Sequence, residues 1–359
     1  MRTMTIAPAA EALDIGDEVI DGHEEVLYCH DEESGLRAII AIHDTTLGPA
    51  LGGTRFKSYD TDQDALHDVL RLSRGMTSKN AAAGLPFGGG KAVIIGDPRT
   101  AKTPELLRAY GRFVDSLDGR YVTAADLGTN SDDLDIVGET TTHLTGRTAG
   151  AGGAGDSGPA TALGVFSAMR AGAERLWGES GLHDRTVGVE GAGKVGGVLT
   201  RLLLDEGANV VVADPDPAAR ERVSAATGGA VTLAESLAGP LDVYAPCALG
   251  ATVTVDRVTS LGARLVCGAA NNQLPTQDED AALHAAGILW VPDYVANAGG
   301  VIHLAGLERL KHEPDVVTAD VRRIGDTARE ILSRSADAGI PTGIAADELV
   351  AARLAAGRG

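Results

Sequence analysis

The stretch TVGVEGAGKVGGVLTRLLLDEGANVVVAD, residues 186–214, predicts a strand, a glycine-rich turn, a helix and a second strand. Its turn matches the pattern GxGxxG. The first glycine permits a tight turn, the second lets the backbone approach a pyrophosphate, and the third lets the helix pack on the strand. The N-terminus of the helix then offers its N–H groups to the phosphates. We therefore expect a dinucleotide-binding turn formed by Gly191, Ala192, Gly193, Lys194, Val195 and Gly196.

Two acidic residues lie beside this turn in the predicted strand–helix–strand unit. Asp214 ends the second strand, where a carboxylate accepts hydrogen bonds from both ribose hydroxyls and repels a 2′-phosphate. We therefore expect NAD rather than NADP as the cofactor. Glu190 directly precedes the first glycine, which is an unusual place for an acid near a pyrophosphate, and nothing in the sequence explains it.

Length, composition and charge narrow the class of protein. The 359 residues are enough for two domains, and an apolar fraction of 44% with a mean hydropathy of +0.02 is typical of a soluble globular chain. No apolar run approaches the roughly 18 residues of a membrane span, and the N-terminus turns acidic where a signal peptide is apolar, so we expect a cytoplasmic protein. The net charge of −19 argues against nucleic acids and membranes as partners.

Cysteine and histidine usage indicates neither a disulfide framework nor a metal centre. The three cysteines include no CxxC pair, as is usual in a reducing compartment. The nine histidines show no HExxH or similar ligand spacing, so we expect no metal site.

A second glycine-rich segment, GMTSKNAAAGLPFGGGK at residues 75–91, contains Lys79 and Lys91 and raises the alternative of a phosphate-binding P-loop. A P-loop requires a glycine, four further residues, and then Gly-Lys followed by Ser or Thr. Counting back from Lys91, the first glycine position is Leu85, and the residue after Lys91 is Ala92. The spacing therefore argues against a phosphate cradle.

Apolar patterning predicts further elements along the chain. We expect strands near residues 26–30, 36–43, 92–97, 121–126, 241–245, 264–268 and 287–291. A helix begins near Thr61, with Asp64 as a capping-box partner, and another covers residues 104–117. The chain beyond about residue 317 has helical character.

A glycine-rich loop, TGRTAGAGGAGDSGP at residues 145–159, has two interpretations. Its GDSGP resembles the nucleophile loop of trypsin-like serine proteases. That motif carries a further glycine and belongs to a disulfide-bonded all-β chain, and neither property applies here. We therefore interpret the loop as the connection between two domains.

Seven motifs, in order along nearly the whole chain, resemble those of the glutamate/leucine/phenylalanine/valine family of amino acid dehydrogenases. They are GPALGGTRF (48–56), GMTSKNAAAGLPFGGGKAVIIGDP (75–98), YVTAADLGT (121–129), VEGAGKVGG (189–197), YAPCALG (244–250), GAANNQL (268–274) and PDYVANAGGVI (292–302). The branched-chain branch, leucine and valine dehydrogenases, is the most similar.

The resemblance implies an α/β fold with two domains flanking a cleft. Residues 1–147 would form a substrate and oligomerisation domain, with the C-terminal helices of residues 331–359 packing back onto it. Residues 148–330 would form a Rossmann-type NAD domain. Members of the family are homo-oligomers, so we expect a homo-oligomer here.

The resemblance also implies the reaction. These enzymes oxidise an L-amino acid by hydride transfer to NAD and hydrolyse the imine to a 2-oxo acid and ammonia. By similarity, Lys79 holds the substrate α-carboxylate, and Lys91 is the general base that activates water. Asp126 would relay protons and balance the charge that develops on the amine. Thr161 and Asn272 would lie near the nicotinamide or the substrate.

The pocket for the amino acid side chain follows from the same resemblance. Besides Lys79, the residues expected to bind substrate are Leu51, Gly52, Gly53, Met76, Ala124, Asn272, Val301 and Leu304. Glutamate-specific relatives carry a lysine at the position of Leu51, and an aliphatic wall there would leave a glutamate carboxylate unpaired. Phenylalanine enzymes use smaller residues at Leu51 or Ala124. We therefore expect a branched aliphatic substrate.

Two alternatives stay open. The segment HLAGLERL (303–310) resembles some phenylalanine enzymes, so a phenylalanine dehydrogenase is the first alternative.

Within the branched-chain class, Leu304 replaces a usual valine, which would shrink the pocket and favour valine over leucine by about 1–3 kcal/mol. The second alternative is a non-catalytic NAD-binding regulatory protein, although such a protein would be expected to lose Lys91 or Asp126.

Overall fold

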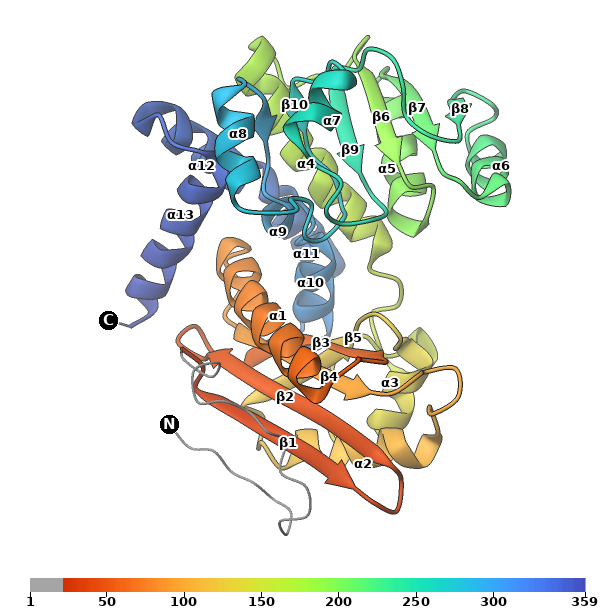
Figure 1. Ribbon diagram of the computed structural model, residues 1–359, viewed down its shortest axis with the longest axis vertical. Helices are drawn as coiled ribbons and strands as arrows, with labels where there is room; N and C mark the ends of the chain where they lie inside the picture. Colours follow the sequence, from red (N-terminus) through yellow and green to blue (C-terminus); the bar gives the residue numbers. More distant parts are fainter. Residues whose placement is uncertain (1–21, 359) are drawn as a thin grey trace. The chain divides into compact units, whose positions relative to one another are not determined.

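The computed structural model describes residues 22–358, which form two compact units (Figure 1). The first unit runs to Gly155 and includes Leu307–Lys311 and the residues from Ala352 onward. The second unit comprises Asp156–Gly306 and His312–Ala351. Each unit is built around its own sheet, which confirms the predicted α/β fold.

The sheet of the first unit is mixed, with the strand order β1-β2-β4-β3-β5. Its strands are β1 (Glu25–Asp31), β2 (Leu36–Asp44), β3 (Ala50–Lys57), β4 (Gly88–Ile95) and β5 (Tyr121–Ala125). β2 pairs antiparallel with β1 and β4, whereas β3 lies parallel to β4 and β5. Side chains at the same level of β4 and β5 are therefore separated only by β3.

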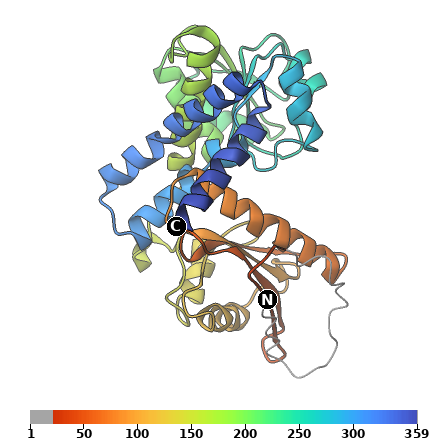
Figure 2. The ribbon, with the colours of Figure 1, turned by 90° about the vertical axis from the view of Figure 1, so that its left-hand side faces the viewer.

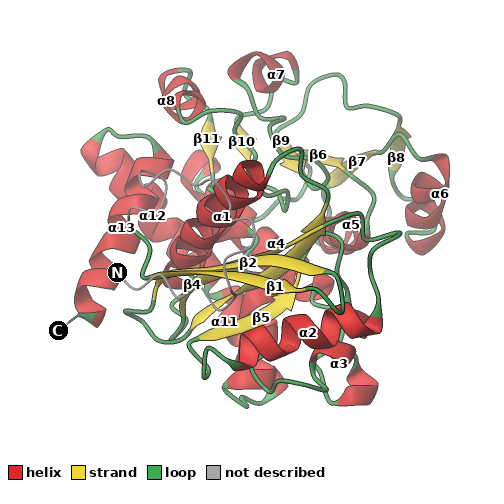
Figure 3. Cartoon of the chain, turned by 60° about the horizontal axis from the view of Figure 1, so that its bottom comes forward, coloured by secondary structure: helices red, strands yellow, loops and turns green. Residues whose placement is uncertain are grey.

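Helices cover both faces of this sheet (Figure 2). On one face, α1 (Asp62–Ala82) packs with Ile39 of β2. On the other face lie α2 (Pro104–Asp115) and α3 (Ser131–Val137), side by side in Figures 1 and 3, which pack with Ile40 of β2. Successive residues of a strand point to opposite faces, so both faces of β2 are apolar.

Most of these elements were predicted from the sequence, but the glycine-rich strands were predicted only in part or not at all. α1 begins with the expected capping box, in which Thr61 and Asp64 accept each other's backbone N–H groups. β4 was expected only after Lys91, yet it begins at Gly88 and includes three glycines. No strand was expected over the residues of β3, which contain a Gly-Gly pair.

The sheet of the second unit is parallel throughout, with the order β11-β10-β9-β6-β7-β8. Its strands are β6 (Thr186–Glu190), β7 (Asn209–Ala213), β8 (Thr232–Ala234), β9 (Val243–Pro246), β10 (Leu265–Val266) and β11 (Leu289–Trp290). Starting from β8, this is the 3-2-1-4-5-6 order of the Rossmann fold. In such sheets ligands bind outside the carboxyl ends of the strands, where the strand order reverses between β6 and β9.

Helices connect and cover these strands. They are α4 (Gly158–Trp177), α5 (Lys194–Asp205), α6 (Pro217–Ala226), α7 (Val255–Ser260), α8 (Asp278–Ala285), α9 (Asp293–Ala296), α10 (Gly299–Leu304), α11 (Pro314–Arg322), α12 (Ile324–Ala338) and α13 (Thr342–Gly357). A 3₁₀ turn spans Ala149–Ala151, and a π-helical turn spans Ala305–Arg309. Within residues 22–358, no helix has both the length and the apolar character of a membrane span.

The division between the units differs from the predicted one, which placed the boundary at residue 147 and assigned 331–359 to the first domain. α12 packs along α4, and the approach is close because a glycine lies at the contact. A Cβ on Gly164 would lie 2.7 Å from the Ile324 Cδ1 atom. α12 therefore belongs to the second unit, and of the C-terminal helices only the residues from Ala352 onward belong to the first.

Candidate active site

Lys91 and Asp126, the expected catalytic residues, form an ion pair in the first unit. Lys91 lies within β4, and Asp126 directly follows β5 on the other side of β3. The Lys91 Nζ atom lies 2.9 Å from the Asp126 Oδ2 atom, and the side chains are 8% and 24% exposed, respectively. The structure thus places a nearly buried ammonium against a carboxylate that still reaches the surface.

Asp126 has a second cationic partner, Arg55 of β3, which sequence reasoning missed. The Arg55 Nε atom donates to the same Oδ2 atom at 3.2 Å. Burial raises the pKa of Asp126, but the charges of Lys91 and Arg55 outweigh it and lower this pKa to about 2. Asp126 is therefore ionised at neutral pH. The only sequence signal for Arg55 was its place in the motif at residues 48–56.

Lys79 and Met76 lie in the last turns of α1, and this end of the helix is bonded to the sheet. The Asn80 side-chain amide donates to the Leu51 carbonyl at 3.2 Å and to the Gly88 carbonyl at 2.6 Å. These bonds tie the helix to β3 and to β4, the strand that carries Lys91. The position of the Lys79 backbone is therefore set by the same two strands.

The glycines before Lys91 are explained by packing within the protein. A Cβ on Gly89 would lie 2.1 Å from the backbone nitrogen of Thr77 on α1. A Cβ on Gly90 would lie 2.8 Å from the Tyr121 ring. The three glycines lie inside a central strand rather than in a loop, so they do not form a phosphate cradle.

In the first unit, the residues expected to bind the substrate side chain lie on β3 and β5. Leu51, Gly52 and Gly53 are consecutive on β3, and Gly53 pairs with Ala124 of β5. A Cβ on Gly52 would lie 1.9 Å from the Gly90 carbonyl oxygen, so this position accepts no side chain. Leu51 and Ala124 are both buried.

In the second unit, the expected pocket residues Val301 and Leu304 lie on α10 and are partly buried. The N-terminal end of this helix touches α4 at Thr161. A Cβ on Gly300 would lie 2.7 Å from the Thr161 Oγ1 atom, whose hydroxyl donates to the Ser157 carbonyl at 3.1 Å. The structure therefore brings Thr161 next to the helix that carries Val301 and Leu304.

Asn272 lies in the loop after β10 and has a left-handed backbone, with φ of +53°. Asparagine tolerates this conformation better than most residues. The Asn272 backbone N–H donates to the Asp293 carboxylate, and its carbonyl accepts the Ala251 N–H at 2.7 Å. These bonds join the loops that follow β9 and β10, at the edge of the sheet where ligands bind in this fold.

The predicted dinucleotide turn lies between β6 and α5 and has the geometry that its glycines imply. Gly191 has φ of +113°, and a Cβ on Gly196 would lie 1.9 Å from the Gly191 carbonyl oxygen. At Gly193, the N-cap of α5, a Cβ would meet no atom of residues 22–358 within 4 Å, and no side chain caps the helix there. Uncapped N–H groups and open space at this position fit a pyrophosphate.

Asp214 follows β7 and reaches this turn. Its Oδ2 atom accepts the backbone N–H of Ala192 at 2.8 Å, and its Oδ1 atom accepts the N–H of Asp216 at 2.9 Å. The carboxylate thus lies beside the glycine-rich turn at the carboxyl ends of β6 and β7. This is where dinucleotide-binding proteins hold a ribose.

Glu190, which the sequence left unexplained, is paired with residues far along the chain. Its carboxylate accepts the hydroxyl of Tyr244 on β9 and, at 3.1 Å, the Nη2 group of Arg257 on α7. The guanidinium balances the charge of Glu190, and the contacts tie β6 to β9 and α7. The carboxylate is therefore a structural link between elements of the unit.

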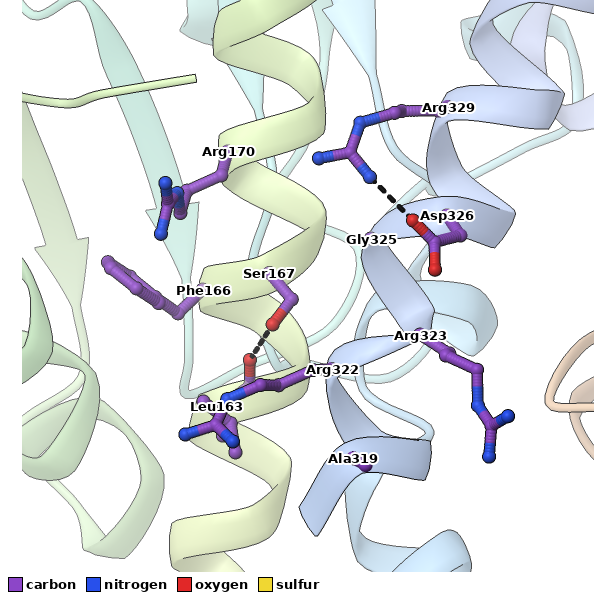
Figure 4. A pocket seen from close by; sticks show the side chains of 10 residues that line it. All are labelled: Leu163, Phe166, Ser167, Arg170, Ala319, Arg322, Arg323, Gly325, Asp326 and Arg329. Atoms are coloured by element: carbon purple, nitrogen blue, oxygen red, sulfur yellow. Dashed lines mark hydrogen bonds and ion pairs between the residues drawn. The ribbon is translucent and has the colours of Figure 1, made fainter. Parts of the chain in front are cut away.

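Outside these residues, the described part of the chain offers a pocket but no metal cluster. The pocket lies between α4 and the α11–α12 region, and four arginines line it: Arg170, Arg322, Arg323 and Arg329 (Figure 4). Arg329 pairs with Glu174 and Asp326, and Arg170 pairs with Glu206. These carboxylates balance much of the positive charge, so we assign the pocket no ligand. In residues 22–358, no group of three or more His, Cys, Asp or Glu side chains is arranged to hold a metal.

Comparison with known proteins relates the chain to dehydrogenases of amino acids. The family model described as Glu/Leu/Phe/Val dehydrogenase, dimerisation domain, matches residues 23–143, and Glutamate/Leucine/Phenylalanine/Valine dehydrogenase matches 218–320. The valine dehydrogenase of Streptomyces coelicolor is 50% identical over 94% of this chain and 93% of its own. The leucine dehydrogenase of Bacillus subtilis is 45% identical over 92% and 91%. The solved L-tryptophan dehydrogenase from Nostoc punctiforme is 40% identical, with a TM-score of 0.81, and covers 94% of this chain and 97% of that chain.

The Rossmann unit and these matches together define the class, which is that of the amino acid dehydrogenases. The chain belongs to the Glu/Leu/Phe/Val dehydrogenase family. Members of this family are oxidoreductases that use a nicotinamide cofactor. The family predicted from the sequence is thereby confirmed.

Proposed function

We propose that this chain catalyses the reversible, NAD-dependent oxidative deamination of a branched-chain L-amino acid. The observation that carries the proposal is the nearly buried Lys91–Asp126 ion pair on the two strands that flank β3. The relatives named valine and leucine dehydrogenase support the substrate class. A homo-oligomer is part of the proposal, because the model matched by residues 23–143 is described as a dimerisation domain.

In this proposal, three residues of the first unit each have a separate role in the reaction. Lys79 binds the α-carboxylate of the substrate as a point charge. Asp126, held ionised by its two cationic neighbours, balances the positive charge of the amine. Bound NAD supplies the hydride acceptor. Lys91 is the general base that takes a proton from the water attacking the imino carbon. The amino acid, water and NAD⁺ thus become a 2-oxo acid, ammonium, NADH and a proton.

The second unit supplies the cofactor site in this proposal. The turn from Gly191 to Gly196 presents N–H groups for the pyrophosphate. Asp214 accepts hydrogen bonds from the ribose hydroxyls, and its negative charge disfavours the 2′-phosphate of NADP. Thr161 and Asn272 lie near the nicotinamide or the substrate.

The pocket residues favour a branched aliphatic side chain over glutamate or phenylalanine. A 40% identical relative is named a tryptophan dehydrogenase, so overall similarity does not decide the substrate. Leu51 provides no partner for a side-chain carboxylate, and its size together with that of Ala124 limits the room for an aromatic ring. By resemblance to the family, Leu304 in place of the usual valine favours valine over leucine as the substrate.

The proposal is tested by following the absorbance of NADH at alkaline pH, with L-valine, L-leucine, L-isoleucine, L-phenylalanine and L-glutamate supplied separately. We expect the highest kcat/KM with the branched aliphatic amino acids, and we expect Leu304→Val to raise the rate with leucine relative to valine. The highest kcat/KM with phenylalanine would instead identify a phenylalanine dehydrogenase. Binding of NAD without turnover of any of the five would support a regulatory protein.

A further inference from the structure

We propose that Arg55, held in place by Asp68, is a positioning residue that fixes the Asp126 carboxylate against Lys91. This inference rests on the proposed function, because it gives Arg55 a part in amino acid oxidation. It adds to the expected catalytic residues a supporting chain that runs from β3 to α1.

The contacts form a continuous chain of charged and polar groups. Lys91 and Arg55 both meet the Oδ2 atom of Asp126, at 2.9 Å and 3.2 Å. The other end of the guanidinium reaches Asp68 on α1, where the Arg55 Nη1 atom lies 2.9 Å from the Oδ2 atom. The Tyr59 hydroxyl donates to this same Asp68 oxygen at 2.8 Å.

Burial makes the electrostatic attraction in these contacts stronger than in a surface ion pair. The side chains of Arg55 and Asp68 are only 18% and 13% exposed, respectively, so solvent screens their charges weakly. The guanidinium is planar and bridges two carboxylates, which limits the rotation of both. Without Arg55, the Asp126 carboxylate would still be neutralised by Lys91, but its rotation would no longer be limited by the guanidinium.

The same chain connects the catalytic carboxylate to the helix that carries Lys79. Asp68 and Lys79 both lie on α1, and Asp68 is held from the outer side by Arg71 at 2.9 Å. The groups that face Asp126 come from separate elements: Lys91 from β4, Arg55 from β3, and the Thr129 hydroxyl, which accepts the Asp126 backbone N–H at 2.9 Å. Arg55 is the member of this set that contacts both the Asp126 and the Asp68 carboxylates, so it links Asp126 to α1.

The test is the kinetics of Arg55→Ala with the amino acid that the wild-type enzyme oxidises fastest. We expect kcat to fall roughly 10- to 100-fold, because a misplaced Asp126 balances the amine charge poorly and no longer orients Lys91, the general base. We expect KM for the amino acid to change by less than about threefold, because Lys79 still binds the α-carboxylate. Millimolar guanidinium chloride should restore part of kcat by filling the vacated space, whereas sodium chloride at the same ionic strength should not.

Two further variants separate positioning from simple stability. Lys102→Ala removes another partly buried ion pair of the same unit, with Asp133 at 2.7 Å, and should lower Tm without changing kcat. Arg55→Lys keeps the positive charge and should retain more kcat than Arg55→Ala. If Arg55→Ala fails to fold, Asp68→Asn should still show a fall in kcat at nearly constant KM.

The outcomes are distinct. An active wild type with unchanged kcat in Arg55→Ala, or in Asp68→Asn where that variant is used instead, would overturn the inference. So would an Arg55→Ala enzyme that guanidinium does not rescue, with Arg55→Lys equally slow. A wild type that oxidises none of the amino acids would contradict the proposed function itself, before any variant is compared.

Discussion

Asp126 illustrates how opposing effects decide the state of one side chain. Burial favours the protonated form of a carboxylic acid, and two adjacent cations favour the carboxylate. The pKa of about 2 shows that the cations prevail. The cost of placing Lys91 almost out of solvent is offset by the same contact, since a buried ammonium needs a paired charge. The pair is therefore a single electrostatic unit, and each member depends on the other.

Asp214 supports a prediction about the choice of cofactor. In Asp214→Asn, the amide oxygen can still accept the Ala192 N–H, but the negative charge is lost. We expect the preference for NAD over NADP, measured as the ratio of kcat/KM values, to fall roughly 10- to 100-fold, as for the loss of a hydrogen bond to a charged group.

The matched control is Asp216→Asn. Asp216 is exposed and caps α6 by accepting the Ala218 N–H at 3.0 Å, a task that asparagine performs equally well. Its cofactor ratio should stay at the wild-type value. An unchanged ratio in Asp214→Asn would remove Asp214 from the ribose site.

At the scale of elements, glycines in the turn between β6 and α5 have two different roles: Gly196 allows close packing, and Gly193 leaves space for the cofactor. A Cβ on Gly196 collides with the backbone of Gly191, so Gly196→Ala should destabilise the protein by roughly 1–3 kcal/mol. A Cβ on Gly193 meets open space, and its φ of −77° suits alanine. The free energy of unfolding of Gly193→Ala should therefore lie within about 1 kcal/mol of the wild-type value. Its KM for NAD should nevertheless rise several-fold, because the added Cβ lies where the pyrophosphate binds.

Thermal unfolding and NAD kinetics of the two variants check this contrast. Gly181→Ala serves as the control, because a Cβ there also meets no atom of the described residues within 4 Å and the position lies outside the turn. Both its Tm and its KM for NAD should match the wild type. A Gly193→Ala enzyme with a wild-type KM for NAD would contradict the placement of the pyrophosphate at this glycine.

The elements show why part of the fold could be predicted from the sequence and part could not. The valine-rich strands β6 and β7 and the capped helix α1 are specified by local patterns, and the structure has them where they were expected. β3 and the start of β4 contain glycines, which are poor strand formers in isolation. Their strand conformation depends on close contacts with α1 and Tyr121, which local patterns do not show.

The candidate site divides in the same way. Lys79, Lys91, Asp126 and the glycine-rich turn were marked by motifs. Arg55, and the partners of Glu190, become evident only when distant segments are brought together. Arg257 lies 67 positions from Glu190 along the chain, and Arg55 lies 71 positions from Asp126. Pairings of this kind require the fold, because no local spacing signals them.

At the scale of the whole molecule, the chemistry and the cofactor site are assigned to separate compact units. Lys79, Lys91 and Asp126 belong to the first unit, whereas the turn from Gly191 to Gly196 belongs to the second. The sequence placed the boundary at residue 147, near the observed one, but the assignment of α12 to the second unit depends on its packing against α4 and could not be read from the sequence. Because Lys91 and the glycine-rich turn lie in separate units, we expect a change at Lys91 to impair catalysis and leave NAD binding intact.

The most direct test of the account is therefore the kcat of Lys91→Ala, measured together with the Kd for NAD. The loss of a general base should lower kcat by roughly 10²- to 10⁴-fold, while the Kd for NAD stays near the wild-type value. Lys102→Ala, which removes a different lysine–carboxylate pair of the first unit, should leave both quantities unchanged. A Lys91→Ala enzyme that retains substantial kcat would contradict the assignment of Lys91 as the base.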